Sequence, residues 1–186
     1  MTNWAHVADV TQIQNGTMAK SSATQLPLKF RTGGKTDVRA QFAALCWRIK
    51  DGKLQICLVT SRNSGRWILP KGWPMHKQTP ASAAATEAFE EAGLSGTAYD
   101  TCLGAYSYVK PLAGGEAPVI TLVYPLQVRK VHKSWPEMRQ RRRKWFSQQK
   151  AARKVAEPEL QRILATFQPH AFLNESAIAR DEKPPI

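Results

Sequence analysis

Apolar residues cluster in short stretches that turn residues separate, and this pattern predicts strands mixed with helices. Two apolar stretches, 38–50 and 54–61, flank the dipeptide Asp51-Gly52, which is typical of a tight hairpin turn. The other expected elements are strands at 67–70, 96–99, 103–110 and 119–131, a loop at 111–118, and helices at 80–92, 147–155 and 158–167. Pro125 lacks a backbone donor, so it predicts an edge position or a bulge in its strand. Mixed elements of this kind indicate an α/β fold, with a sheet sandwiched between helices.

The same pattern divides the chain into one structured domain with a segment on either side. The region 38–168 carries the expected strands and helices, and the chain is long enough for a sizeable core. Residues 1–37 are polar and mixed, and we expect an extension that is mobile or lies across the domain. Met18 within it is a candidate alternative to Met1 as the translation start. Residues 169–186 are expected to form a loose tail.

The most distinctive element is a short acidic helix at 80–92. Thr79 is expected to cap its N-terminus, with Pro80 in its first turn and Gly93 as a left-handed stop. The helix carries glutamates at 87, 90 and 91, which share one face because they are separated by three or four residues. The residues expected to pack on the sheet lie on the opposite face and are Ala81, Ala85, Ala88, Phe89 and Ala92.

Three carboxylates this close repel one another, and a bound cation relieves that repulsion. Glu87, Glu90 and Glu91 are therefore expected to hold Mg²⁺, with Mn²⁺ as a substitute. Magnesium in turn indicates a phosphate-bearing substrate. The alternative is a solvated acidic face on an ordinary amphipathic helix, and the helix taken alone does not decide between them.

The stretch 72–94 resembles the Nudix box, the signature of the Nudix hydrolases, which cleave nucleoside diphosphates linked to another moiety. The residues that match the signature at the correct spacing are Gly72, Glu87, Ala88, Glu90, Glu91, Gly93 and Leu94. The resemblance implies a Nudix-type α/β/α sandwich with a mixed sheet. It also implies a metal held by Glu87 and Glu91, with Glu90 as the third candidate, and hydrolysis of a phosphoanhydride by a metal-activated water.

Two positions depart from the signature. Gln78 stands where the first glutamate belongs, and Thr86 stands where an arginine belongs. Gln78 cannot donate a carboxylate, and Thr86 cannot form the guanidinium fork that would hold a neighbouring glutamate. Either a structural ion pair has been replaced by a polar contact and catalysis is spared, or the enzyme is weakened or inactive. Because all three glutamates remain, we favour an active enzyme.

Positive charge is concentrated in one part of the chain. The formal net charge is +13, and the window 129–154 holds eleven Lys or Arg residues and one acid, including the basic run 141–144. Such a segment suits binding of a polyphosphate, of RNA or of anionic lipid, and a solvated loop without a ligand is the remaining interpretation. We favour the polyphosphate, because the metal would neutralise the bond being broken while cations hold the remaining phosphates.

Two segments, 61–67 and 143–146, look like the diphosphoinositol polyphosphate phosphohydrolase branch of the family, which also hydrolyses diadenosine polyphosphates. This resemblance extends from about 38 to 167. The phosphate-binding candidates that it implies are Arg62, Arg66, Lys71, Arg143 and Lys144. Gly72 is expected to keep its loop close to metal and phosphate, where a side chain would intrude. Trp73 is the candidate for stacking on an adenine ring.

The sequence therefore predicts a Mg²⁺-dependent pyrophosphohydrolase that acts on a nucleoside polyphosphate, such as a diadenosine polyphosphate, or on a diphosphoinositol polyphosphate. The alternative is a catalytically weak Nudix-fold module that binds RNA or another polyanion through its basic segment 129–154.

The cysteines and the absence of long apolar runs indicate where in the cell the protein is expected. Cys46, Cys57 and Cys102 lack metal-type spacing, and the first two lie in apolar runs, so we expect buried free thiols there. No apolar run approaches the roughly 18 residues that span a bilayer, and the N-terminus lacks the layout of a secretion signal. We expect a cytoplasmic protein with no membrane partner.

Overall fold

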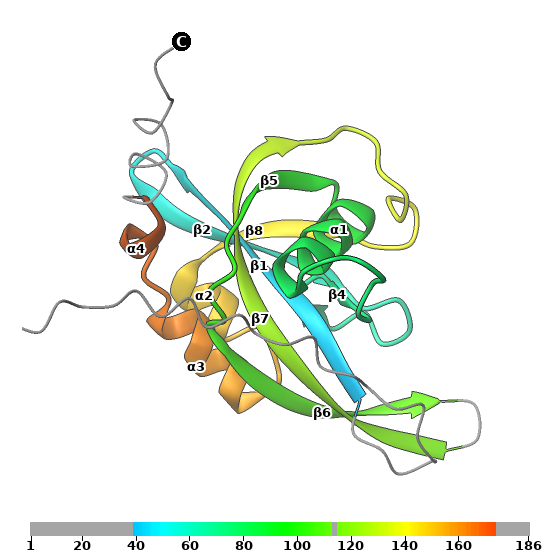
Figure 1. Cartoon of the computed structure of the whole chain (residues 1–186). Helices are drawn as coiled ribbons and strands as arrows, with labels where there is room; N and C mark the ends of the chain where they lie inside the picture. The colour runs from blue at the N-terminus through cyan, green and yellow to red at the C-terminus, as the bar shows by residue number, and fades with distance from the viewer. Residues whose placement is uncertain (1–38, 113–114, 174–186) are drawn as a thin grey trace, which may run out of the picture. The chain divides into compact units, whose positions relative to one another are not determined.

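The computed structural model describes residues 39–112 and 115–173, which form a mixed sheet flanked by helices (Figure 1). The strands are β1 Arg39–Lys50, β2 Lys53–Thr60, β3 Trp67–Ile68, β4 Lys71–Gly72, β5 Leu94–Ala98, β6 Gly104–Leu112, β7 Gly115–Val131 and β8 Arg143–Ser147. The helices are α1 Pro80–Ala92, α2 Gln148–Ala152, α3 Pro158–Thr166 and α4 His170–Leu173. The expected extension at 1–37 and residues 174–186 of the expected tail lie outside the described residues.

The central strands follow the order β3-β2-β1-β7-β5, while β4 pairs with β1, β6 with β7 and β8 with β2. β1 and β7 run parallel, and the other pairs are antiparallel, so the sheet is mixed as expected. The β1–β2 hairpin turns at Asp51 and Gly52, which both have positive φ angles, of 51° and 69°. A turn of this kind matches the twist of the strands that it joins, which confirms the predicted hairpin.

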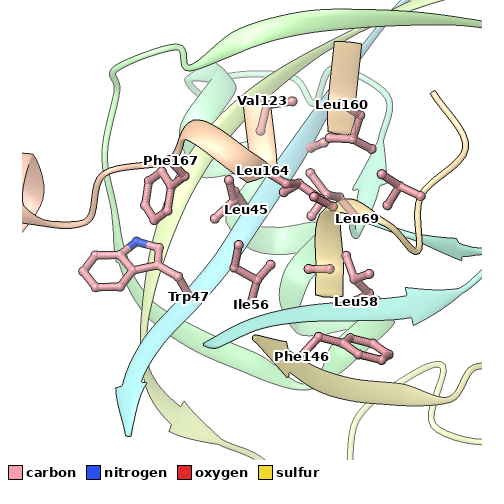
Figure 2. Close-up of a cluster of buried hydrophobic side chains, with 14 of the residues drawn as sticks. Leu45, Trp47, Ile56, Leu58, Leu69, Val123, Phe146, Leu160, Leu164 and Phe167 are labelled. Carbon is pink, nitrogen blue, oxygen red and sulfur yellow. The ribbon is translucent and has the colours of Figure 1, made fainter. Parts of the chain in front are cut away.

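Side chains of β1 alternate between two cores, one on each face of the sheet. Leu45 and Trp47 point to the core that α2 and α3 cover, where Leu160 and Leu164 are also buried (Figure 2). Phe42, Ala44 and Cys46 of the same strand point to the other core, which α1 covers with alanines. The predicted α/β/α sandwich is therefore confirmed. No helix within 39–112 and 115–173 is both long and apolar enough to cross a membrane.

The helix face that packs on the sheet differs from the expected one at Phe89. Ala81, Ala88 and Ala92 are buried as expected, whereas Phe89 is 37% exposed and packs edge-on against His132. Small alanine side chains let α1 lie close to the sheet and leave no room for an aromatic ring. Glu91 is buried on this side instead.

The predicted loop at 111–118 is wrong, because β6 and β7 form one long hairpin. Lys110 pairs with Ala117, and Pro111 pairs with Glu116. The sequence showed two glycines and two prolines in this stretch, which are typical of a loop, but both prolines lie near the end of the hairpin.

The prediction that Pro125 marks an edge or a bulge is also wrong. Pro125 lies in the middle of β7 and pairs with Leu45 of β1 without a shift in register. On its other side the β6 pairing ends at Val123 and the β5 pairing begins at Leu126, and the Pro125 carbonyl accepts from Tyr99 N at 3.1 Å. The missing N–H therefore falls at the junction of two strands, where no ladder bond is lost.

Three smaller differences lie in the C-terminal part. The short strand β8 was not predicted, and the helix expected at 147–155 is confined to Gln148–Ala152. The first residues of the expected loose tail form α4, and Phe172 in it is buried against Phe167. Cys46 and Cys57 are buried free thiols, as predicted.

Candidate active site

The acidic helix α1 begins and ends as the sequence predicted. Thr79 has an extended backbone, and its hydroxyl accepts from Ser82 N at 3.2 Å. Pro80 stands in the first turn, where its missing N–H costs no hydrogen bond. Gly93 adopts the left-handed conformation, with φ 61°. These caps set the first and last residues of α1, and so determine how its glutamates are placed relative to the sheet.

The two positions that depart from the signature contact one another. Thr86 Oγ1 donates to Gln78 Oε1 at 3.2 Å and to the carbonyl of Ser82 at 3.1 Å. A polar contact between residues 78 and 86 is one of the two outcomes that the sequence allowed for this pair. The helix α1 carries no cation of its own, since no residue from Pro80 to Ala92 is Lys or Arg.

Glu87 is half-buried and lies directly against Gly72. A Cβ atom at residue 72 would stand 1.8 Å from Glu87 Oε1, so only glycine leaves the carboxylate in this position. Within the described residues the Glu87 side chain makes no hydrogen bond or ion pair. Burial, followed by the charge of Glu90, raises the pKa of the Glu87 carboxyl above its usual value.

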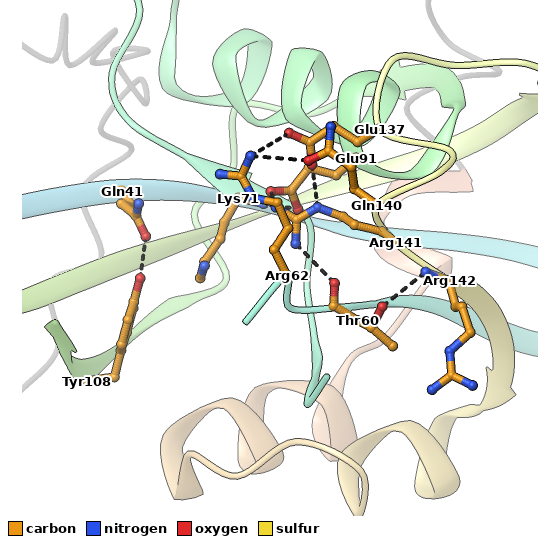
Figure 3. A network of polar contacts seen from close by, with 10 residues as sticks. All are labelled: Gln41, Thr60, Arg62, Lys71, Glu91, Tyr108, Glu137, Gln140, Arg141 and Arg142. Carbon is orange, nitrogen blue, oxygen red and sulfur yellow. Dashed lines mark hydrogen bonds and ion pairs between the residues drawn. The ribbon is translucent and has the colours of Figure 1, made fainter. Parts of the chain in front are cut away.

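Glu91 is buried and held by an arginine from outside the helix (Figure 3). Arg141 pairs with Glu91 Oε1, and Lys71 N donates to the other carboxylate oxygen at 3.4 Å. The Arg141 guanidinium also pairs with Glu137 and donates to the Thr60 carbonyl at 3.0 Å. Burial raises the pKa of the Glu91 carboxyl to about 7, although Arg141 and Lys71 act in the opposite direction.

The three carboxylates do not form a ready-made cage. Within 39–112 and 115–173, no group of three or more Asp, Glu, His or Cys side chains is placed to hold a metal ion. The reason is visible in the contacts, because Glu91 faces Arg141. The donor set still suits a hard divalent cation, since Glu87 and Glu90 have no partner among the described side chains. The paired carboxylate of Glu91 also keeps free lone pairs.

Two cation-lined cavities have walls that include a residue in contact with Glu91. The smaller, of about 120 Å³, is lined by Arg66, Lys71, Lys110 and Tyr108 among others. The larger, of about 270 Å³, is lined by a different set of cations, namely Arg62, Arg139, Arg141 and Arg142, together with neighbouring loop residues. Lys71 lines one cavity and Arg141 the other, and both contact Glu91. The buried carboxylate therefore contacts one wall residue of each cavity.

Tyr108 and Lys110, which line the smaller cavity, also contact side chains outside its wall. Tyr108 donates through its hydroxyl to Gln41 Oε1 at 2.7 Å, and Lys71 Nζ lies 5.3 Å from the centre of the Tyr108 ring. Burial lowers the pKa of the Lys71 ammonium. Trp73 is 37% exposed at the surface, and Lys110 Nζ lies 4.7 Å from the centre of its ring.

The predicted phosphate-binding residues separate into two groups. Arg62 lines the larger cavity, and Arg66 and Lys71 line the smaller one. Arg143 and Lys144 line neither. A contact of Arg62 with Glu137 at 3.4 Å and one of Arg66 with Glu157 at 3.7 Å hold these cations at the cavity edges.

Arg143 has a structural position in place of the expected phosphate contact. Its guanidinium donates to the Ala92, Gly93 and His132 carbonyls and lies over the Trp135 ring. It therefore satisfies carbonyl groups at the C-terminus of α1, where a cation is also favoured by the helix dipole. Lys144, its neighbour on β8, is exposed and lies 5.8 Å from the Phe146 ring centre.

Sequence reasoning missed Arg141, Arg139, Lys110 and Tyr108 as individual site residues. Arg141 was recognised only as part of the basic run. The signal that separates the run is an alternation in burial, because Arg141 and Arg143 are turned inward whereas Arg142 and Lys144 are exposed, and only Arg143 and Lys144 belong to the strand β8.

Comparison with known proteins agrees with the fold and the acidic helix. A family model described as NUDIX domain matches residues 39–167. Nudix hydrolase 12, mitochondrial, of Arabidopsis thaliana is 29% identical over 119 residues, which cover 62% of this chain and 59% of that protein. Diphosphoinositol polyphosphate phosphohydrolase 2 of Rattus norvegicus is 29% identical over 122 residues, 64% of either chain. The chain thus spans less than two thirds of the length of these curated relatives.

Solved structures show the same fold. The crystal structure of the C. elegans Ap4A hydrolase has a TM-score of 0.53 and 22% sequence identity, and the match covers 74% of this chain and 99% of that one. The NUDIX hydrolase from Nitrosomonas europaea has a TM-score of 0.54 and 18% identity, and the match covers 69% of this chain and 86% of that one. Because the family model matches more than half of the sequence, the chain belongs to the Nudix hydrolase family.

Proposed function

We propose that this chain is a divalent-metal-dependent pyrophosphohydrolase that cleaves a phosphoanhydride bond in a polyphosphate-type substrate. The observation that carries the proposal is that Glu91 contacts one wall residue of each of two cavities whose walls carry cations. A polyphosphate has anionic groups on both sides of the bond that is cleaved. One cavity can hold each side, while the carboxylates of α1 stand at the bond between them.

The residues that would hold Mg²⁺, or Mn²⁺ as a substitute, are Glu87, Glu90 and Glu91. When bound, the metal supplies charge withdrawal from phosphate oxygens and a water of lowered pKa. Lys71, Arg66 and Lys110 would bind phosphate oxygens on one side of the scissile bond. Arg62 would bind them on the other side.

A carboxylate of α1 would also take the proton of the attacking water. Glu87 is the best candidate, because its carboxylate oxygens have no partner among the described residues and its pKa is raised by burial. Glu91 is less suited, since its Oε1 is occupied by Arg141. Gly72 keeps the Glu87 carboxylate in place by leaving room for it.

The finer part of the proposal concerns the substrate, which we propose to be a diadenosine polyphosphate or a diphosphoinositol polyphosphate. The support is the resemblance of 61–67 and 143–146 to that branch, and the names of the rat and C. elegans proteins. Trp73 offers an exposed ring for an adenine, and Lys110 beside it offers a cation for the adjoining phosphate.

The test is a panel of diadenosine and diphosphoinositol polyphosphates incubated with the purified chain and Mg²⁺, with products separated by anion-exchange chromatography. We expect hydrolysis of at least one compound, and none with chelator. Glu91→Gln is expected to abolish the products, whereas Glu159→Gln, which removes the same charge from an exposed position on α3, is expected to keep them. Failure to hydrolyse any member of the panel would refute the proposal.

A second candidate function is binding of RNA or another polyanion without turnover. The observation that favours it is the number of exposed cations that remain in 129–154 after Arg141 and Arg143 are committed to α1. They include Lys130, Lys133, Lys150, Arg153 and Lys154. Tight, salt-sensitive RNA binding by a chain that hydrolyses nothing in the panel would favour this function.

A further inference from the structure

Arg141 is a buried cation that pairs with two glutamates, Glu91 and Glu137. Only 6% of its side chain is exposed, and the carboxylate of Glu91 beside it is equally buried. An unpaired charge at such a depth would strongly destabilise the folded state. The contacts that pair the Arg141 guanidinium are therefore required by the fold.

The three nitrogens of the guanidinium have three different partners (Figure 3). One terminal nitrogen contacts Glu91 on α1, the other donates to the Thr60 carbonyl at the end of β2, and Nε contacts Glu137 in the segment 132–142. These partners come from three separate parts of the chain. A planar fork held at three points has one orientation, and it therefore fixes the orientation of the carboxylate that it holds.

The acidic helix needs such a cation from outside, because it carries none. At position 86, where the signature has an arginine, Thr86 is bonded to Gln78 and to its own helix. Arg141, which follows Glu91 by fifty residues in the chain, instead reaches the box glutamate directly.

We propose that Arg141 is a positioning residue that fixes the Glu91 carboxylate for metal binding, in place of the arginine that the signature carries at position 86. This inference rests on the proposed metal-dependent function. Arg141 Nη2 contacts Oε1 of Glu91, and the Lys71 amide contacts Oε2, so each oxygen keeps a lone pair for a cation. Arg141 is thus compatible with a bound metal and sets the direction in which the carboxylate presents its free lone pairs.

Two other roles for the same contact predict different outcomes. If Arg141 merely stabilised the fold, its loss would lower the melting temperature and leave metal affinity unchanged. If Arg141 occupied the metal site as a competitor, its loss would tighten metal binding, because a positive charge would be removed. A positioning role predicts weaker binding, since Glu91 then loses its fixed orientation.

The experiment measures Mn²⁺ binding to the substrate-free protein by electron paramagnetic resonance at about pH 8, where a carboxylate of pKa about 7 is largely ionised. Arg141→Met is expected to weaken binding by about tenfold or more. Arg141→Lys is expected to remain about fivefold weaker than wild type, because one ammonium cannot contact all three partners. Arg153→Met, which removes an exposed arginine just after α2, is the charge-matched control and is expected to bind as wild type does.

Unchanged or tighter Mn²⁺ binding in a folded Arg141→Met variant would overturn the positioning role. If that variant does not fold, Glu137→Gln decides, since it removes one support of the guanidinium and leaves Glu91 intact. We expect it to weaken Mn²⁺ binding by about threefold, and unchanged binding would overturn the inference. A wild-type chain that binds no Mn²⁺ would instead refute the proposed function itself.

Discussion

Replacing Gly72 with alanine is expected to damage the site while leaving the fold intact. The three atoms nearest to a Cβ at residue 72 all belong to the carboxyl group of Glu87, at 1.8, 2.1 and 2.7 Å. A real Cβ makes ordinary contacts at 3.4 Å or more. The Glu87 carboxylate must therefore retreat by about 1.5 Å, and a displacement of about 1 Å at a catalytic group can cost about 100-fold in rate.

The stability cost should be small because the displaced atoms are the end of a flexible side chain. We expect Gly72→Ala to change the free energy of unfolding by less than about 1 kcal/mol, since the methyl group also restricts the unfolded chain. Gly96→Ala is the matched comparison. Its Cβ would stand 1.9 Å from the backbone carbonyl oxygen of Gln127, at a register shift between β5 and β7. Backbone cannot rotate away, so we expect a loss of about 3 kcal/mol there.

The assay combines urea unfolding with Mn²⁺ titration and the rate of hydrolysis under saturating substrate. Gly72→Ala should unfold close to the wild-type midpoint and lose about 100-fold in rate. A Gly72→Ala variant with wild-type rate and Mn²⁺ affinity would refute the role given to Glu87. A variant as unstable as Gly96→Ala would show instead that Gly72 serves the fold.

Three further predictions concern pH, capping and packing. In the metal-free chain, burial raises the pKa of the Glu91 carboxyl to about 7, so the folded state binds more protons than the unfolded state between pH 4.5 and that value. Stability should therefore fall by up to about 3 kcal/mol as the pH rises through this window. Urea unfolding should show this slope in wild type, and an equally steep slope in Glu91→Gln would contradict the assignment. Thr79→Ala should cost about 1 kcal/mol by the same method, because the Ser82 amide loses its acceptor, and a Thr79→Ser variant should retain most of the stability. Leu45→Ala, which empties a fully buried position between the sheet and α3, should cost about 2–5 kcal/mol in the unfolding free energy, whereas an unchanged midpoint would place Leu45 outside the core.

The parts of the fold that the sequence predicted depend on neighbours in the chain. The turn at Asp51-Gly52 and the caps Thr79 and Gly93 are set by backbone preferences within a few residues, and the structure has all three. The parts that it did not predict depend on distant partners. Pro125 is acceptable inside a central strand only because β5 and β6 meet beside it, and no local pattern reports where two other strands end.

The candidate site divides in the same way. The spacing of Glu87, Glu90 and Glu91 on one helix is local, and the sequence placed all three on one face. The contact of Glu91 with Arg141 joins residues from α1 and from the segment before β8, and it required the pairing of β8 with β2 to be known. A strand of five residues rich in cations gives a weak signal, so the run 141–144 looked like one continuous surface for phosphate.

The structure divides the basic run 141–144 by an alternation of inward and outward side chains that begins just before β8. Arg141 and Arg143 turn inward and contact the acidic side chain and the last carbonyls of α1, whereas Arg142 and Lys144 face outward. Removing either inward cation would leave acceptors of α1 without a donor, and removing an outward one would not. The net charge of the chain therefore overstates the number of cations that are available to bind a polyanion. Part of the excess of Arg and Lys is used inside the protein, where it contacts the buried glutamate and the last carbonyls of α1. The same argument explains how the helix can lack the signature arginine and still keep its buried glutamate paired.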